Sequence, residues 1–226
     1  MTAEITGNTA PIKAILFDLD GTFADTAPDM ARALNVIRFQ RGLPALPLAT
    51  IRPHVSRGAS GMLDVGFGIN LQHETFATLR DAFYDEYQQN ICIESALFDG
   101  IESLVDTLER RDIVWGIVTN KAARFALPIA QMLGFAERAA CIVCGDTTAH
   151  TKPHPAPLLH AAHAIGIPPS HILYVGDDER DIQAAHAAGM GAVAAAYGYI
   201  SADSDPKYWN AEYSISTPAE LALLLG

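Results

Sequence analysis

Basic residues, cysteines and long apolar runs are scarce in this sequence, and each shortage argues against a class of protein. The 226 residues hold 15 Lys and Arg against 26 Asp and Glu, which gives a formal net charge of −11. Such a surface repels the phosphate backbone of nucleic acids, so we expect no nucleic-acid partner. No apolar run approaches the roughly 18–20 residues that a membrane span requires, and we therefore expect no membrane partner either.

Two further shortages concern the cellular compartment. The stretch MTAEITGNTAPIK at residues 1–13 is polar and has neither the basic region nor the apolar run of a signal peptide. Cys141 and Cys144 have a CxxC spacing, but no second cysteine pair completes a zinc site, and they fall in a run typical of a buried strand. We therefore predict a cytoplasmic protein whose cysteines are buried structural thiols.

Apolar residues are abundant, at 50% of the chain, and from residue 95 onward strand-like runs alternate with helix-like ones. This alternation predicts an α/β fold with a doubly wound parallel sheet. The predicted strands after this point cover residues 113–120, 141–146, 171–178, 192–198 and 211–216.

Residues 25–94 have a different pattern, with helix-like segments and no convincing strand. A stretch of about 70 residues is too long for a crossover connection, so it predicts a small all-helical domain inserted into the α/β core. The core would comprise residues 12–24 and 95–226. An insertion at this point would lie over the carboxyl end of the sheet and could act as a lid.

The stretch AILFDLDGT at residues 14–22 begins with an apolar run typical of a strand buried on both faces. Asp18 and Asp20 lie two residues apart on this strand and point the same way, and Gly21 then allows a tight turn. Two carboxylates so close repel each other unless a cation joins them, and oxygen ligands suit Mg²⁺. The alternative is an Asp-Gly turn that merely closes the strand.

Polar residues also follow the later predicted strands. Thr119, Asn120 and Lys121 offer a hydroxyl, an amide and helix-start N–H groups, which would form an anion pocket or simply cap the next helix. Lys152 is followed by three prolines at alternate positions. These prolines keep the chain extended, so we interpret Lys152 as a fixed phosphate contact at a helix entrance rather than a solvated charge.

An acid cluster of Asp177, Asp178 and Asp181 follows the strand predicted at 171–178. These acids could equally cap and stabilise the start of a helix. However, the carboxyl ends of parallel strands meet at one edge, where open α/β sheets bind ligands. The sequence therefore predicts one site that combines the Asp pair, the hydroxyl, the lysine and this cluster.

The order of these motifs resembles the haloacid dehalogenase superfamily, whose motifs are DxDGT, a Ser or Thr, a Lys and GDxxxD. The resemblance runs from Lys13 onward, and the helical insertion is similar to that superfamily's first cap class. The runs VTNK, KPHPAPLL, GDDERDIQAAHAAGM and YGYI resemble the phosphoglycolate phosphatase group. WGIVTNKAARFALPI and YWNAEY resemble its branch acting on N-acetylmuramic acid 6-phosphate. Phe23 stands where that family commonly has Leu.

The resemblance implies Mg²⁺-dependent hydrolysis of a small phosphomonoester through an aspartyl-phosphate intermediate. Asp18 would be the nucleophile, and Asp20 would protonate the leaving group and then activate water. Thr119 and Lys152 would hold the phosphoryl oxygens.

The resemblance also implies a metal site. Asp18, the backbone carbonyl of Asp20 and Asp177 would bind Mg²⁺, and Asp181 would orient Lys152 or a metal-bound water. Asp178 would be a helix cap.

Substrate selection is expected from the insertion, where the loop RPHVSRGASGM is either a binding loop or an ordinary basic connection. Both substrates that the resemblance suggests carry a carboxylate, so we predict that Arg57, or else His54 or Arg52, reaches it when the cap closes. The partner would be a small phosphorylated metabolite that bears a carboxylate, and the protein would be a monomer or homodimer. The remaining predicted substrate contacts are Gly21, Thr22, Asn120 and Lys121.

Three other activities use related residues. A phosphosugar mutase differs mainly in excluding water during transfer. A receiver-type signalling domain has a phosphorylated Asp, a Thr and a Lys, but neither the insertion nor the DxD spacing. A dehalogenase needs neither Asp20 nor the magnesium-binding acid Asp177. These comparisons favour the phosphatase.

Overall fold

The structure is a computed structural model, and it describes residues 11–201 and 203–225. Most of the N-terminal stretch that we expect to carry no signal peptide therefore lies outside the described residues. Within the described part of the chain, no helix is both long enough and apolar enough to cross a membrane.

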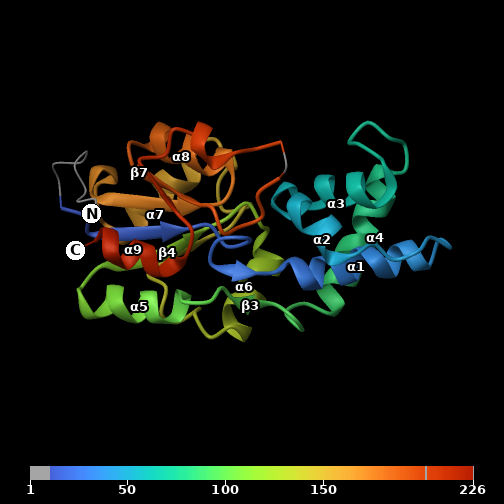
Figure 1. The fold of residues 1–226 in the computed structure, drawn as a ribbon, viewed down its shortest axis with the longest axis horizontal. Helices are drawn as coiled ribbons and strands as arrows, with labels where there is room; N and C mark the ends of the chain where they lie inside the picture. Colours follow the sequence, from blue (N-terminus) through green and yellow to red (C-terminus); the bar gives the residue numbers. More distant parts are fainter. Residues whose placement is uncertain (1–10, 202, 226) are drawn as a thin grey trace.

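The core is a six-stranded parallel sheet with the strand order β5-β4-β1-β6-β7-β8 (Figure 1). The doubly wound α/β prediction is therefore confirmed. The central strand β1 is fully buried because apolar residues cover both of its faces. The strands are β1 (Ala14–Phe17), β4 (Val114–Val118), β5 (Ile142–Val143), β6 (Ile172–Gly176), β7 (Gly191–Ala195) and β8 (Tyr213–Ile215).

Helices cover both faces of the sheet (Figure 1). One apolar cluster joins one face of the strands to α5, α6 and α9, and a second cluster joins the other face to α7 and α8. Phe23, the departure from the family pattern, is buried in the first cluster and stacks on Trp115. The helices are α5 (Ile101–Arg110), α6 (Ala123–Met132), α7 (Ala156–Ile165), α8 (Glu179–Ala188) and α9 (Pro218–Leu224), with 3₁₀ turns at Pro169–His171 and Pro206–Tyr208.

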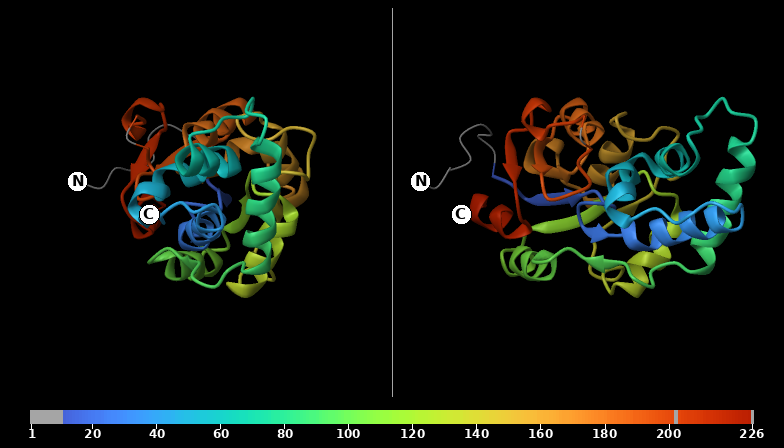
Figure 2. Two further views of the ribbon diagram at one scale, coloured as in Figure 1. Left: turned by 90° about the vertical axis from the view of Figure 1, so that its right-hand side faces the viewer. Right: turned by 45° about the vertical axis from the view of Figure 1, so that its right-hand side comes forward.

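The segment predicted to be helical is helical, and it packs around its own apolar cluster beyond the carboxyl end of the sheet (Figures 1 and 2). Leu34, Met62 and Phe83 are buried in this cluster, which Phe125 and Ile129 of α6 extend from the core side. The helices are α1 (Ala27–Phe39), α2 (Leu48–Ile51), α3 (Gly58–Phe67) and α4 (Phe76–Gln89), with a 3₁₀ helix at Arg52–Arg57.

A small antiparallel ribbon links the helical segment to the core. Its strands are β2 (Ala24–Asp25) and β3 (Ala96–Leu97), and they pair where the chain leaves the core and where it returns. The sequence analysis found no strand here, because two residues carry no detectable periodicity. The ribbon lies at the predicted boundaries, 24/25 and 94/95, while the division into domains stays a prediction.

The cysteines are free thiols. Cys144 is buried and Cys141 is partly buried. Burial raises the pKa of each of these two thiols to about 11, which keeps them protonated at neutral pH. This agrees with the predicted structural role.

Candidate active site

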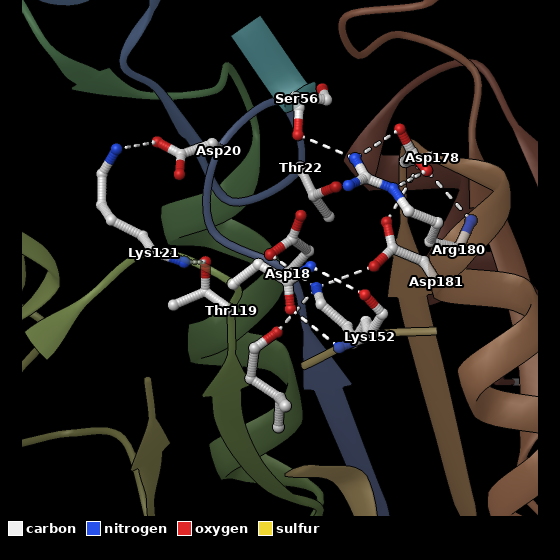
Figure 3. Close-up of polar contacts among 12 residues, drawn as sticks. Asp18, Asp20, Thr22, Ser56, Thr119, Lys121, Lys152, Asp178, Arg180 and Asp181 are labelled. Carbon is white, nitrogen blue, oxygen red and sulfur yellow. Dashed lines mark hydrogen bonds and ion pairs between the residues drawn. The ribbon is translucent and has the colours of Figure 1, made fainter. Parts of the chain in front are cut away.

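The ends of β1, β4 and β6 bring the predicted residues together. The register places Phe17 beside Ile117 and Val175, so the three strands reach the same edge in step. In Figure 3, Asp18, Thr119, Lys152 and Asp181 converge at this edge. The loop entering α7 supplies Lys152, while the first turn of α8 supplies Asp181.

Lys152 is buried at the centre of the site. Its Nζ lies 2.8 Å from Asp18 Oδ1 and 2.7 Å from Asp181 Oδ1, and it donates to the Val118 carbonyl and the Tyr174 hydroxyl. Burial alone would lower the pKa of this ammonium, but the two carboxylates outweigh burial and raise it. Lys152 is therefore a fixed positive charge that faces Asp18.

Asn120 holds the backbone of Lys152. Its side-chain amide donates to the Lys152 carbonyl at 3.0 Å, and its Oδ1 accepts from the Lys152 N–H at 2.9 Å. The amide that the sequence analysis assigned to substrate binding thus positions the lysine. Thr119, which is buried, accepts a hydrogen bond from the Lys121 N–H at 3.1 Å.

Asp20 is held by two donors on one oxygen. Lys121 Nζ lies 2.9 Å from Asp20 Oδ1, and the Thr26 hydroxyl donates a short hydrogen bond to the same atom. Lys121 is nearly buried and lies 5.0 Å from the ring centroid of Tyr87 on α4. Burial opposes its charge, but Asp20 outweighs burial and raises the pKa of Lys121. The charge of Lys121 is therefore matched by Asp20.

Asp177 is tied to both parts of the protein. It accepts hydrogen bonds from the Thr22 hydroxyl (3.1 Å), the Tyr199 N–H (2.8 Å) and, from the helical insertion, the Ser56 hydroxyl (3.1 Å). Gly21 makes the tight turn with φ +85°, and a Cβ there would lie 2.1 Å from Asp177 Oδ2. Only glycine leaves room for this carboxylate.

The acid cluster fits a divalent cation. Buried carboxylate oxygens of Asp18, Asp177 and Asp181 lie within 4.8 Å of one another. Burial, and then the charges of Asp18 and Asp181, raise the pKa of Asp177 well above its usual value. Asp18 Oδ1 contacts the Lys152 ammonium, and no other hydrogen-bond donor of the described residues reaches it. Crowded, poorly solvated carboxylates of this kind suit Mg²⁺, which prefers oxygen ligands.

Asp178 has the helix-cap position expected for it. Its carboxylate accepts from the Arg180 N–H at 3.0 Å, and its own N–H donates to Asp181 Oδ2 at 3.1 Å. Arg180 pairs with Asp178 through two contacts of 2.7 and 2.9 Å and donates to the Ser56 carbonyl at 2.8 Å (Figure 3). The sequence analysis missed Arg180, because an arginine in a first helical turn is usually solvated.

A cavity of about 410 Å³ opens above the strand ends. The core side contributes charged and polar groups, and the insertion contributes Phe76, Phe83, Tyr84 and Tyr87 of α4. The sequence analysis missed this aromatic wall, since the spacing along α4 is also that of an ordinary buried helix face. The charged and polar core residues are Asp18, Asp20, Thr119, Asn120, Lys121, Arg124, Lys152, Asp178, Arg180 and Asp181, and Ala122 and Phe125 are the apolar ones.

The three candidates in the insertion loop have different positions. Arg57 lines the cavity, with its Nη2 3.3 Å from Asp64 Oδ2. Arg52 instead makes two hydrogen bonds to Asp25, at 2.8 and 2.9 Å. Neither Arg52 nor His54 is among the residues that line the cavity. Pairing with Asp25 therefore holds the Arg52 charge elsewhere.

Comparison with known proteins identifies the family of this chain. Residues 15–195 match the haloacid dehalogenase-like hydrolase family. The chain is 42% identical over 210 residues to N-acetylmuramic acid 6-phosphate phosphatase of Pseudomonas aeruginosa, with 93% of each chain covered. It is 46% identical over 209 residues to phosphoglycolate phosphatase of Xanthomonas campestris pv. campestris, covering 92% of this chain and 94% of that one.

A crystal structure of a predicted phosphoglycolate phosphatase from Haemophilus somnus has a similar fold. Its TM-score is 0.82 at 26% identity, with 94% of this chain and 97% of that one covered. The resemblance seen in the sequence is thus confirmed over most of the chain. This protein belongs to the haloacid dehalogenase-like hydrolase family.

Proposed function

We propose that this protein is a Mg²⁺-dependent phosphatase that hydrolyses a small phosphomonoester through an aspartyl-phosphate on Asp18. The observation that carries the proposal is the position of Asp18, which lines the cavity, contacts the Lys152 ammonium and lies within 4.8 Å of carboxylate oxygens of Asp177 and Asp181. A nucleophile of this reaction needs a nearby cation for the phosphate and a second acid for proton transfer. The phosphatase names of the similar proteins support the same activity.

The first step is attack of an Asp18 oxygen on phosphorus. Lys152 donates to a phosphoryl oxygen from its fixed position, and the Thr119 hydroxyl donates to another, so both stabilise charge in the transition state. Mg²⁺, held by Asp18, the Asp20 carbonyl and Asp177, would neutralise phosphoryl charge. Asp181 keeps Lys152 oriented through its 2.7 Å contact.

Asp20 moves the proton in both steps. It protonates the leaving oxygen of the substrate and then takes a proton from the water that attacks the aspartyl-phosphate. Lys121 and Thr26 both contact Oδ1, so Oδ2 is the oxygen that carries the proton. Lys121 stabilises the carboxylate form that remains after the proton has left.

The helical insertion acts as a cap over the reacting groups. Ser56 connects it to the core twice, through its hydroxyl to Asp177 and through its carbonyl to Arg180. A closed cap limits the water near Asp18 and strengthens the electrostatic contacts inside the cavity. Arg57 lines the cavity from the insertion loop, so it is one candidate for contact with a substrate carboxylate.

The proposal is tested by phosphate release from a panel of phosphomonoesters in the presence of Mg²⁺. The panel includes phosphoglycolate, N-acetylmuramic acid 6-phosphate and p-nitrophenyl phosphate, compared by kcat/KM. We expect turnover of at least one compound by the wild type and none by Asp18→Asn. Failure of the wild type to release phosphate from any of them would overturn the proposal.

A further inference from the structure

The cations that line the cavity differ in whether an acid partner matches their charge. Among the described Lys and Arg residues on its walls, Arg124 alone has no carboxylate oxygen within 4 Å of its charged group. Each of the other positive charges on the cavity wall is therefore paired with a negative one, and the Arg124 guanidinium is the exception. The matched pairs are Lys152 with Asp18 and Asp181, Lys121 with Asp20, Arg180 with Asp178, Arg57 with Asp64, and Arg80 with Asp81.

Aromatic rings, and no acid, hold Arg124 in place. Its guanidinium carbon lies 4.5 Å from the ring centroid of Phe125 and 4.9 Å from that of Tyr84. Arg124 lies in the first turn of α6 in the core, while Tyr84 belongs to α4 of the insertion. Ring contacts use the faces of a guanidinium and leave its in-plane N–H groups available for a planar anion.

The cavity that Arg124 lines also has an apolar surface. Phe76 and Phe83 of α4, together with Tyr84 and Leu71, line the same cavity of about 410 Å³. A volume in this range accommodates a ligand much larger than phosphoglycolate. The cavity therefore suits a phosphomonoester with an extended body, one side of which is apolar.

We propose that Arg124 is a specificity-determining residue, which binds a carboxylate on the extended body of the phosphomonoester substrate. This inference rests on the proposed function and assigns the second anion of the substrate to a residue outside the insertion loop. Lys152 attracts the phosphate of the substrate. Because the protein has a net charge of −11, a second anionic group of the substrate needs a further cation that no acid of the protein already pairs with. Arg57 meets that need less well, because it would have to leave Asp64.

The contact also couples recognition to the cap. Tyr84 reaches Arg124 from the insertion, so the stacked arrangement exists only while α4 lies against the core. A carboxylate bound to Arg124 therefore favours the closed arrangement. A substrate without a carboxylate lacks this contribution.

The test is a matched substrate pair. N-Acetylmuramic acid 6-phosphate and N-acetylglucosamine 6-phosphate share a sugar, an acetamido group and a phosphate, but only the first has a carboxylate. We expect Arg124→Ala to lower kcat/KM for N-acetylmuramic acid 6-phosphate by about tenfold to a hundredfold more than for the partner without a carboxylate. Arg124→Lys keeps the charge but not the fork, and should recover only part of this selectivity. Arg80→Ala is the control, with less than threefold change in the same ratio. Arg57→Ala tests the competing carboxylate contact, and the inference expects it to leave the ratio nearly unchanged.

Three results would overturn the inference while leaving the phosphatase in place. These are an equal loss on both sugars with Arg124→Ala, no loss on either sugar with Arg124→Ala, and a selective loss with Arg57→Ala instead. Hydrolysis of p-nitrophenyl phosphate, abolished by Asp18→Asn, shows in each case that the proposed function itself stands. A wild type that releases phosphate from none of these compounds would contradict the proposed function.

Discussion

The cavity has a core wall, formed by residues of the α/β core, and an insertion wall, formed by residues of the helical insertion. The charged side chains of the two walls differ in how deeply they are buried. On the core wall, the side chains of Lys152 and Asp181 are each 2% exposed, whereas Arg57 and Asp64 on the insertion are 50% and 46% exposed. Removing one partner of a buried pair typically costs about 3–5 kcal/mol, and an exposed pair contributes about 0–1 kcal/mol. The core wall is therefore suited to fixed chemistry, while the exposed charges of the insertion wall can change with little loss of stability.

The largest expected effect comes from metal removal, which tests whether the core wall works without its cation. Chelation should reduce phosphate release to background, and added Mg²⁺ should restore it, because the crowded acids need a divalent ion. Ca²⁺ should inhibit, since its higher coordination number can make Asp18 bidentate and unavailable for attack.

Melting temperatures test whether Mg²⁺ binds to the folded protein, independently of its effect on turnover. Mg²⁺ should raise the melting temperature of the wild type, by linkage, and should raise that of Asp177→Asn much less. Full turnover by metal-free enzyme would contradict the assignment of a metal to the core wall.

The next prediction separates the role of Asp20 in proton transfer from the role of Asp18 as nucleophile. Asp20→Asn keeps Asp18 but removes proton transfer, so kcat should fall by roughly 10²–10⁴ for an alkyl phosphate. The loss should be smaller in the first step with p-nitrophenyl phosphate, whose leaving group needs little protonation. Rapid-quench kinetics on both substrates check this prediction, and an equal loss on both would remove Asp20 from leaving-group protonation.

A stability measurement tests whether the core charges are matched as pairs. Lys121→Met should lower the free energy of unfolding by about 3 kcal/mol, because it leaves the Asp20 carboxylate without its cation. The double variant Asp20→Asn with Lys121→Met should recover at least half of that loss. Urea denaturation gives these values, and simple additivity of the two substitutions would mean that the pair is not coupled.

The smallest effect concerns the connection between the two walls. Ser56→Ala removes the hydroxyl that donates to Asp177 but keeps the carbonyl that accepts from Arg180. One such hydrogen bond contributes about 0.5–1.5 kcal/mol, so kcat/KM should fall by less than about tenfold and alike for all substrates. Ser60→Ala, at another cavity-lining serine, is the matched control. A substrate-selective loss would make Ser56 a binding residue instead.

The core wall could be predicted from the sequence because a buried strand is an apolar run, and the polar residues that follow the run mark its end. Ala14–Phe17 is apolar on both faces, and the polar groups that follow β1, β4 and β6 must meet at one edge of a parallel sheet. The α/β fold, the helical nature of the insertion and the membership of the family were confirmed. The roles of the individual site residues stay predictions.

The insertion wall was harder to predict, because its residues have patterns typical of ordinary helices. Phe76, Phe83 and Tyr87 follow the spacing of a buried helix face whether or not a cavity lies beside them. Arg124 and Arg180 lie near helix starts, where arginine is usually solvated, and only tertiary contacts distinguish them. The packed structure likewise decides that Arg57 pairs with Asp64 while Arg124 has aromatic rings as its neighbours.

Peptide mass spectrometry of enzyme quenched with acid during turnover examines the chemistry assigned to Asp18. With Mg²⁺ and a substrate from the panel, the peptide that contains Asp18 should carry a phosphoryl group, and the same peptide from Asp18→Asn should carry none. Asp99→Asn, at an exposed acid outside the cavity, is the control and should be phosphorylated on Asp18 like the wild type. A phosphoryl group on another residue, or full turnover by Asp18→Asn, would contradict the proposed mechanism.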